Sequence, residues 1–260
     1  MNKFVLLAFV GALVSCSSTK NLTQLEIADP TINYCEGKYY LYGTGSNVGI
    51  RVYESKDLKT WTIPADSYKG HVMMKGMQAF GTKGFWAPQM MHHDGSYYLL
   101  YVANEEIAIA KSDSPYGLFK QDKVDCLKAL TKQIDPFLFV DEDGKKYLYH
   151  VRLKDGNNIC VATMNDDMAT MGNDIVPCIT ATEPWENTNS YPSVPIIEGP
   201  TVLKHKGYYY LFYSANHFMS QDYAVGYAVS KSPLGPWEKP EGNPILSSRL
   251  LPEYKGTGHG

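Results

Sequence analysis

Three acidic residues occupy the opening of a repeated sequence pattern, where their side chains could carry out acid–base chemistry. Each repeat opens on a residue followed by Pro, and the acids lie in Asp29-Pro30, Asp135-Pro136 and Glu198-Gly199-Pro200. One further repeat opens on Ala87-Pro88 and has no acid there. Carboxyl groups that share a site can accept a proton when ionised and donate one when protonated. If the openings of the repeats meet in space, these acids form one site.

A structural role for each acid is the alternative. A buried Asp before Pro can end a strand or accept hydrogen bonds from backbone N–H groups. For a single Asp-Pro pair that interpretation is the simpler one, but three carboxylates at matching repeat positions favour function. Four other acids lie in turn-like contexts and are interpreted as solvated: Asp57, Asp113, Asp155 and Asp222.

The repeats predict short antiparallel strands. An aromatic run follows each opening pair, as at residues 39–42 and 208–213, and an alternating β-branched segment follows that run. Turns such as Asp94-Gly95 separate the opening segment from the aromatic run, as hairpins require. A repeat of about 50 to 60 residues made of short strands is typical of propeller blades. We therefore expect an all-β propeller whose first strands face one axis and bring the three acids together.

The chain contains four copies of the repeat and ends where another would begin. Its last residues are Gly256-Thr257-Gly258-His259-Gly260. Propellers protect their strand edges by closing the ring. We therefore expect a fragment of a longer protein, truncated at the start of the next blade, with apolar flanks exposed on the first and fourth blades.

Composition supports a folded domain and argues against a nucleic-acid partner. Of the 260 residues 44% are hydrophobic, which is enough for a substantial core. The net charge is −3 and the sequence has no basic run, so the electrostatic footprint of a nucleic-acid-binding protein is missing.

The N-terminal residues are predicted to target and tether the protein. Lys3 precedes an apolar run at residues 4–14 that is too short to span a bilayer as a mature helix. The run ends in Leu13-Val14-Ser15-Cys16, which resembles a bacterial lipobox. Residues 1–15 would be the signal peptide, residues 16–25 the lipidated Cys16 and a tether, and residues 26–260 the propeller. An ordinary secretory signal with a chance Cys is the alternative.

A lipid anchor would place the protein outside the cytoplasm, in the periplasm or on the outer-membrane surface, with the anchor as its only membrane contact. The remaining cysteines have spacings that form neither a disulfide framework nor a CxxC motif: Cys35, Cys126, Cys160 and Cys178. Cys35 and Cys160 fall in strand patterns and are expected to be buried as small hydrophobic residues.

Five motifs in order resemble those of glycoside hydrolase family 43. They are Ala28-Asp29-Pro30, Phe85-Trp86-Ala87-Pro88-Gln89, Ile134-Asp135-Pro136-Phe137, Ile197-Glu198-Gly199-Pro200 and Gly256-Thr257-Gly258-His259. The resemblance implies a five-bladed β-propeller and a glycosidase that hydrolyses O-glycosyl bonds with inversion. Carried over residue by residue, it implies that Asp29 is the general base, Glu198 the general acid, and Asp135 the residue that orients Glu198 and modulates its pKa.

These roles suit the residue types. An inverting glycosidase needs an ionised and a protonated carboxyl group about 6.5–9.5 Å apart, with room for a water. Asp29 is expected to be well hydrogen-bonded and ionised, and Glu198 to be desolvated and protonated near neutral pH. The charge of Asp135 would raise the pKa of Glu198 further.

Four residues are candidates for substrate contact: Trp86, His150, Asn216 and His259. Trp86 would offer a flat face to sugar C–H groups, with core packing as the alternative. The resemblance places His259 near the propeller axis, beside a central ion or water cluster. No cofactor is required, and a structural calcium is the metal considered. His150, Asn216 and the neighbouring His217 follow strand runs, and local hydrogen bonding is an equal alternative for them.

The resemblance implies an exo-acting enzyme that releases terminal pentose, α-L-arabinofuranosyl above all, from plant-type polysaccharides or oligosaccharides. A β-xylosidase and a galactofuranosidase are alternatives on the same fold, because the three acids do not determine the sugar. A non-catalytic glycan-binding propeller is a third, although both Asp29 and Glu198 are present.

Overall fold

The computed structural model describes residues 21–44 and 47–259, and the regular structure in this part of the chain is almost entirely β. Its strands are β1 (Ala28–Cys35), β2 (Lys38–Thr44), β3 (Gly49–Ser55), β4 (His71–Met74), β5 (Trp86–His93), β6 (Ser96–Ala103), β7 (Glu106–Ser112), β8 (Gln133–Val140), β9 (Lys146–Leu153), β10 (Asn157–Met164), β11 (Val176–Ile179), β12 (Ile197–His205), β13 (Tyr208–Ala215) and β14 (Ala224–Ser230). A short 3-10 helix, η1 (Pro184–Glu186), precedes β12. Within the described ranges no helix has the length and apolar character needed to cross a membrane.

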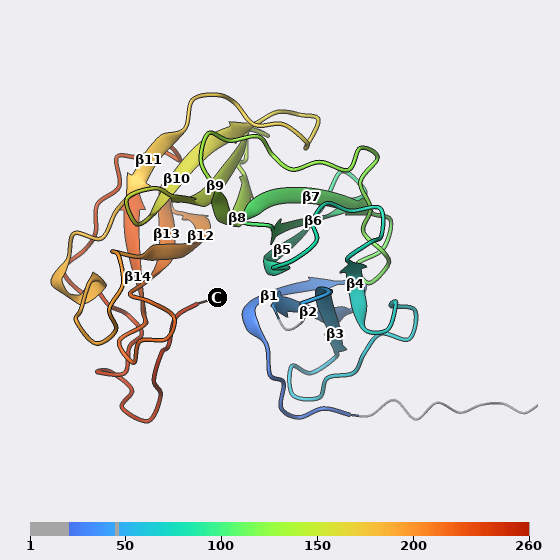
Figure 1. Cartoon of the computed structure of the whole chain (residues 1–260), viewed down its shortest axis with the longest axis horizontal. Coiled ribbons are helices and arrows are strands. Elements are labelled where there is room, and N and C mark those ends of the chain that lie inside the picture. The colour runs from blue at the N-terminus through green and yellow to red at the C-terminus, as the bar shows by residue number, and fades with distance from the viewer. Residues whose placement is uncertain (1–20, 45–46, 260) are drawn as a thin grey trace, which may run out of the picture.

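The strands form four antiparallel sheets that are consecutive blades of a propeller. Blade 1 contains β1–β4, blade 2 β5–β7, blade 3 β8–β11 and blade 4 β12–β14, and strands adjacent in sequence pair within each blade. Figure 1 shows the blades around a common centre, with β1, β5, β8 and β12 innermost and the C-terminal end of the chain reaching the middle. The all-β propeller class predicted from the repeats is confirmed, with four blades in the described residues.

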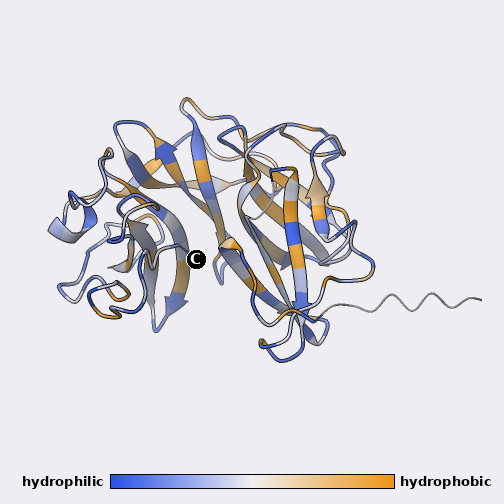
Figure 2. Ribbon diagram, turned by 60° about the horizontal axis from the view of Figure 1, so that its bottom comes forward, coloured by the Kyte–Doolittle hydropathy of each residue, from blue (hydrophilic) through white to orange (hydrophobic). Residues whose placement is uncertain are grey.

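Apolar side chains pack between neighbouring blades. Hydrophobic and hydrophilic bands alternate along the strands in Figure 2, as expected where successive side chains point to opposite faces. One buried cluster joins blades 1 and 2 and includes Tyr42 and Leu99, and another joins blades 3 and 4 and includes Tyr149 and Leu211. A smaller cluster, with Leu100 and others, joins blades 2 and 3. Burial between blades therefore fixes the inner strands relative to one another.

A repeated hydrogen bond also ties the blades in pairs. The hydroxyl of Tyr42 donates to the carbonyl of Pro115 in blade 2 at 2.6 Å, and Tyr149 donates to Pro233 in blade 4 at 2.6 Å. Both carbonyls lie in the matching Ser-Pro turns of residues 112–119 and 230–237. The similarity of these two turns therefore has a structural reason, since each receives a Tyr from the preceding blade.

The flank of blade 1 that faces away from blade 2 is partly covered, and the expected apolar exposure remains on β1, where Ile32 is 51% and Tyr34 66% exposed. Leu22 and Leu25 pack there against a cluster that contains Tyr53 and Trp61. Leu22 also exchanges backbone hydrogen bonds with Trp61, at 2.8 and 2.9 Å. Residues 22–25, which we assigned to the tether, therefore belong to the folded domain, because Leu22 and Leu25 bury part of this flank.

The corresponding flank of blade 4 is only partly covered. Tyr210 stacks there on Tyr227 and Phe212 lies tilted against it, with ring centroids 6.4 and 6.0 Å from that of Tyr227, and all three are partly exposed. The described cysteines are free: Cys35, Cys126, Cys160 and Cys178. Cys160 is buried and Cys35 packs at the edge of the core. The signal peptide and Cys16 lie outside the described residues.

Candidate active site

The X-Pro pairs form a β-bulge in each of the four inner strands. The pairing register shifts between Ala28 and Thr31 in β1, and at the equivalent positions of β5, β8 and β12. The residue before each Pro has a positive φ: 49° at Asp29, 42° at Ala87, 52° at Asp135 and 62° at Gly199. Bulges redirect side chains, and a positive φ in a residue other than Gly carries strain. The repeated strain lies where the candidate acids enter the centre.

Blade 4 differs because its bulge has Gly in the strained position and its acid one residue earlier. A β-carbon on Gly199 would lie 2.3 Å from Cδ2 of His259, so no side chain fits there. The absent side chain leaves space for the imidazole of His259 against the backbone of β12. Glu198 consequently approaches the centre from a different backbone position than Asp29 and Asp135 do.

His259 is the cation that links the acids. Its Nδ1 lies 3.0 Å from Oδ1 of Asp29, and its Nε2 lies 3.9 Å from Oδ2 of Asp135. Burial opposes its protonation, but the charges of Asp135, Asp29 and Glu198 together raise the pKa of His259 to about 9. The imidazolium therefore partly neutralises a cluster of three carboxyl groups drawn from blades 1, 3 and 4.

Asp29 is held as a carboxylate. Burial alone would raise its pKa, but hydrogen bonds from His259, Thr44 and the Ala87 N–H, with the charge of His259, lower it below the ordinary value. Thr44 Oγ1 donates to Oδ2 of Asp29 at 2.5 Å and accepts the Ala87 N–H at 3.0 Å. An ionised, hydrogen-bonded carboxylate at the centre can accept a proton from water.

Glu198 is held as an acid. It is only 9% exposed, and burial, reinforced by the charge of Asp135, raises its pKa to about 7. Two neutral donors bind it: the hydroxyl of Tyr223 at 2.8 Å from Oε1 and the amide of Asn157 at 3.2 Å from Oε2. A carboxyl group that keeps its proton near neutral pH can donate it to a leaving oxygen.

Asp135 lies between the other two acids. Its Oδ2 accepts the N–H of Gly199 at 3.0 Å, which couples it to the backbone that carries Glu198. Burial and the charge of Asp29 raise its pKa, against the opposing effects of His259 and the Gly199 N–H. A cavity of about 400 Å³ opens at this centre, and its lining includes Asp29, Asp135 and His259.

A comparison with family models decides the relationship. The model described as "Glycosyl hydrolases family 43" matches residues 19–260. The chain belongs to this family. It is therefore a glycoside hydrolase, an enzyme that hydrolyses O-glycosyl bonds, and the resemblance inferred from the five motifs is confirmed.

Relatives in the family carry names that refer to both xylan and arabinan. A solved structure named endo-1,4-beta-xylanase, from Bacteroides thetaiotaomicron VPI-5482, is 40% identical with a TM-score of 0.83, covering 94% of this chain and 81% of that one. A probable arabinan endo-1,5-alpha-L-arabinosidase B of Aspergillus fumigatus is 26% identical, over 86% of this chain and 70% of its own length. A putative beta-xylosidase of Escherichia coli K12 is 28% identical over 82% of this chain, which spans 40% of that relative.

The four residues predicted to contact substrate lie in different surroundings. His259 lines the central cavity, and Trp86, 38% exposed, lies beside the bulge of blade 2 with its ring over Gly84. His150 has no exposed surface, and burial lowers its pKa to about 4. The structure therefore brings His259 to the acids and leaves Trp86 at the surface, whereas His150 is enclosed within blade 3.

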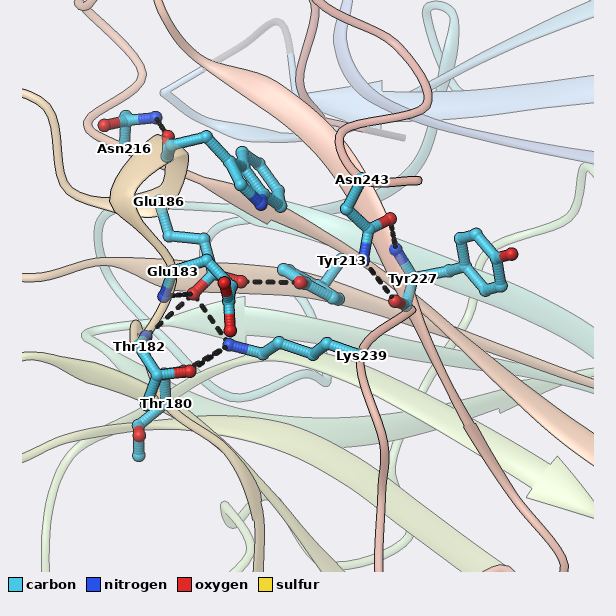
Figure 3. Close-up of polar contacts among 10 residues, drawn as sticks. Thr180, Thr182, Glu183, Glu186, Tyr213, Asn216, Tyr227, Lys239 and Asn243 are labelled. Carbon is cyan, nitrogen blue, oxygen red and sulfur yellow. Dashed lines mark hydrogen bonds and ion pairs between the residues drawn. The ribbon is translucent and has the colours of Figure 1, made fainter. Parts of the chain in front are cut away.

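Asn216 is buried, and its side chain forms three hydrogen bonds to backbone groups. Its Nδ2 donates to the carbonyls of Trp185 and Asp222 at 2.8 and 2.9 Å, and its Oδ1 accepts the Thr188 N–H at 2.8 Å. Figure 3 shows Asn216 attached to the loop that carries Glu186. These contacts give Asn216 a supporting role in two loops of blade 4.

Three residues that contact the acids were not predicted. Thr44 ends β2, Asn157 begins β10 and Tyr223 immediately precedes β14. Each lies at the end of a second or third strand, on the side of its blade where the inner strands begin. This placement could have been predicted from the sequence, because strand ends on one side of a propeller lie around the same opening.

The residues at the centre do not fit the predicted structural calcium by themselves. Calcium takes about six to eight oxygen ligands. In residues 21–44 and 47–259 no group of three or more His, Cys, Asp or Glu side chains is arranged to hold a metal ion. The carboxylate of Asp29 is instead occupied by the imidazolium of His259. The calcium therefore stays a prediction.

Proposed function

We propose that the protein hydrolyses glycosidic bonds with inversion, with Glu198 as general acid and Asp29 as general base. The observation that carries this proposal is that two carboxyl groups in one charge cluster have pKa values shifted in opposite directions. The pKa of Asp29 is lowered and that of Glu198 is raised to about 7. An inverting mechanism needs these two protonation states at once near neutral pH.

The proposed reaction is a single displacement. Asp29 accepts one proton from a water, whose oxygen attacks the anomeric carbon as the glycosidic C–O bond breaks. Glu198 gives its proton to the departing oxygen, so that a sugar hemiacetal and an alcohol are formed. Asp135 holds the backbone of Glu198 through the Gly199 N–H and keeps the pKa of Glu198 high.

For the substrate, the proposal is the release of terminal pentose, α-L-arabinofuranosyl first, from plant-type polysaccharide or oligosaccharide. The relative from Aspergillus fumigatus, whose name refers to arabinan, supports an arabinose-containing substrate but is named as an endo-enzyme. A β-xylosidase is the second candidate. The 40% identity to a structure named as a xylanase and the similarity to a putative beta-xylosidase favour it.

The test is turnover together with stereochemistry. The chain is incubated with p-nitrophenyl α-L-arabinofuranoside and p-nitrophenyl β-D-xyloside, beside a Glu198→Ala variant, and the first-formed anomer is identified by NMR. Hydrolysis with inversion that is lost in Glu198→Ala is expected. Retention of configuration would exclude the mechanism, and glycan binding with no turnover would favour the glycan-binding alternative.

We also propose that the mature protein is a lipoprotein anchored through Cys16 outside the cytoplasm. The support is the sequence Leu13-Val14-Ser15-Cys16 after an apolar run. Expression of the full chain in a bacterium with labelled palmitate should label the protein, and a Cys16→Ser variant should stay unlabelled. Equal labelling of the two would overturn this assignment.

A further inference from the structure

Three aromatic rings form a stack at the surface of blade 4. The ring of Tyr191 lies parallel to that of His217, with centroids 4.3 Å apart and planes at 16°, and His217 stacks on Phe218 at 4.6 Å and 25°. Phe218 is 64% exposed and the adjacent Met219 is 60% exposed. We call Tyr191, His217 and Phe218 the aromatic platform. Its outer ring presents a flat apolar face to solvent.

The platform is held by a network of hydrogen bonds below it. The buried Asn216, which precedes His217, bonds to Trp185 of η1, to Thr188 after η1 and to Asp222 in the loop between β13 and β14. Ser190 and Ser220 join the same two loops through their hydroxyl groups at 2.5 Å. The N–H of Met219 donates to Nδ1 of His217 at 3.1 Å. The platform is therefore preorganised, and because Nδ1 of His217 accepts this bond, Nε2 is the ring nitrogen left to donate.

The platform and the proposed general acid are connected by one short loop. Residues 216–223 connect β13 to β14, and Tyr223, at the end of this loop, donates to Glu198. Backbone hydrogen bonds fold the loop tightly, from Ser220 to the His217 carbonyl at 2.7 Å and from Tyr223 to the Ser220 carbonyl at 3.2 Å. Ala215, just before the loop, pairs with Ile197, just before Glu198. One short loop therefore carries both a contact to the acid and the exposed ring.

We propose that the aromatic platform binds a sugar ring of the substrate on the leaving-group side of the scissile bond. Glu198 protonates the departing oxygen, so the sugar that leaves lies next to Glu198 and its loop. The exposed face of Phe218 suits the C–H face of a sugar ring, and Nε2–H of His217 can donate to a hydroxyl group. For its substrate class, a pentose oligosaccharide, this inference rests on the function proposed above.

The test compares substrates that do and do not reach the platform. A pentosyl fluoride has a one-atom leaving group, whereas arabino- and xylo-oligosaccharides place sugars beyond the scissile bond. Phe218→Ala is expected to lower the ratio of kcat/KM for the oligosaccharide to kcat/KM for the fluoride by about tenfold. Phe218→Trp keeps a flat face and should retain most of the ratio. Tyr34→Ala is the matched control, because Tyr34 is 66% exposed at the opposite end of β1 from Asp29.

Binding provides a readout that does not depend on turnover. In a Glu198→Gln background, Phe218→Ala should weaken oligosaccharide binding by about tenfold in calorimetry, and Tyr34→Ala should leave it unchanged. An unchanged ratio and unchanged binding in Phe218→Ala would overturn the platform. Failure of the wild-type chain to hydrolyse the fluoride would overturn the proposed function instead, and the binding measurement would still decide the platform.

Discussion

Asp29 and Glu198 enter the centre from bulges of the same kind, yet their surroundings give them opposite chemistry. Asp29 is bound by a cation, the imidazolium of His259, and by the hydroxyl of Thr44. Glu198 accepts hydrogen bonds from two neutral donors, Tyr223 and Asn157, and its pKa is raised by burial and by the charge of Asp135. The difference teaches that the repeated backbone feature positions the acids, whereas side chains from other segments set their protonation states.

The supporting side chains also come from different parts of the ring. Thr44 of blade 1 links Asp29 to the Ala87 N–H of blade 2, and His259 comes from the C-terminal segment. Asn157 of blade 3 reaches Glu198 of blade 4. Each acid therefore depends on a contact across a blade boundary, so that packing between blades contributes directly to the pKa values at the centre.

The largest effect is expected from removing each acid in turn. Asp29→Asn and Glu198→Gln should each lower kcat on an oligosaccharide by about a thousandfold or more. A pentosyl fluoride should separate them, because its leaving group needs no proton. Glu198→Gln should keep substantial activity on the fluoride, and Asp29→Asn should not. Steady-state kinetics on both substrates would test this, with the exposed Glu253→Gln as control. Equal behaviour of the two variants on the fluoride would contradict the assignment.

Replacing Asp135 should have the next largest effect. Glu198 must be protonated to act, so activity is lost as the pH rises through its pKa of about 7. Asp135→Asn removes a nearby negative charge, so the pKa of Glu198 falls and the basic limb of the pH profile of kcat/KM moves to lower pH. Activity at pH 7 should fall by about 10- to 100-fold. Asp143→Asn, at a hairpin tip, is the control and should leave the pH profile and the rate unchanged. The same result for Asp135→Asn would exclude this role for Asp135.

Tyr223→Phe should move the same limb in the opposite direction. The hydroxyl of Tyr223 stabilises the carboxylate form of Glu198, so its removal raises the pKa of Glu198. The basic limb is therefore expected at higher pH, while kcat falls by about tenfold because the acid is less well oriented. Tyr227→Phe, on β14 at the outer flank of blade 4, is the control. A shift to lower pH would contradict the assigned contact.

The sequence predicted the repeated part of this site and missed the part that does not repeat. The X-Pro pairs marked all four bulges, because a residue before Pro at matching positions reveals one backbone feature used four times. Thr44, Asn157 and Tyr223 carry no such mark, since each has a different residue type and lies on a different strand end. For Asn216, which follows a strand, substrate contact and local hydrogen bonding were equal alternatives, and its hydrogen bonds to two loops become visible only in three dimensions.

The smallest expected effect tests the Asp29 side of the comparison. Thr44→Val removes a donor to Asp29 without changing its counter-charge, so the pKa of Asp29 should rise. Asp29 must be ionised to act, and the acidic limb of the pH profile should therefore move to higher pH. Because His259 still lowers this pKa, kcat/KM near neutral pH should change by no more than about threefold. Thr170→Val, at an exposed position, is the control. If Thr44→Val moved the basic limb of the pH profile instead, Thr44 would act on Glu198 as well as on Asp29. The two acids would then not have separate environments, and the comparison between them would fail.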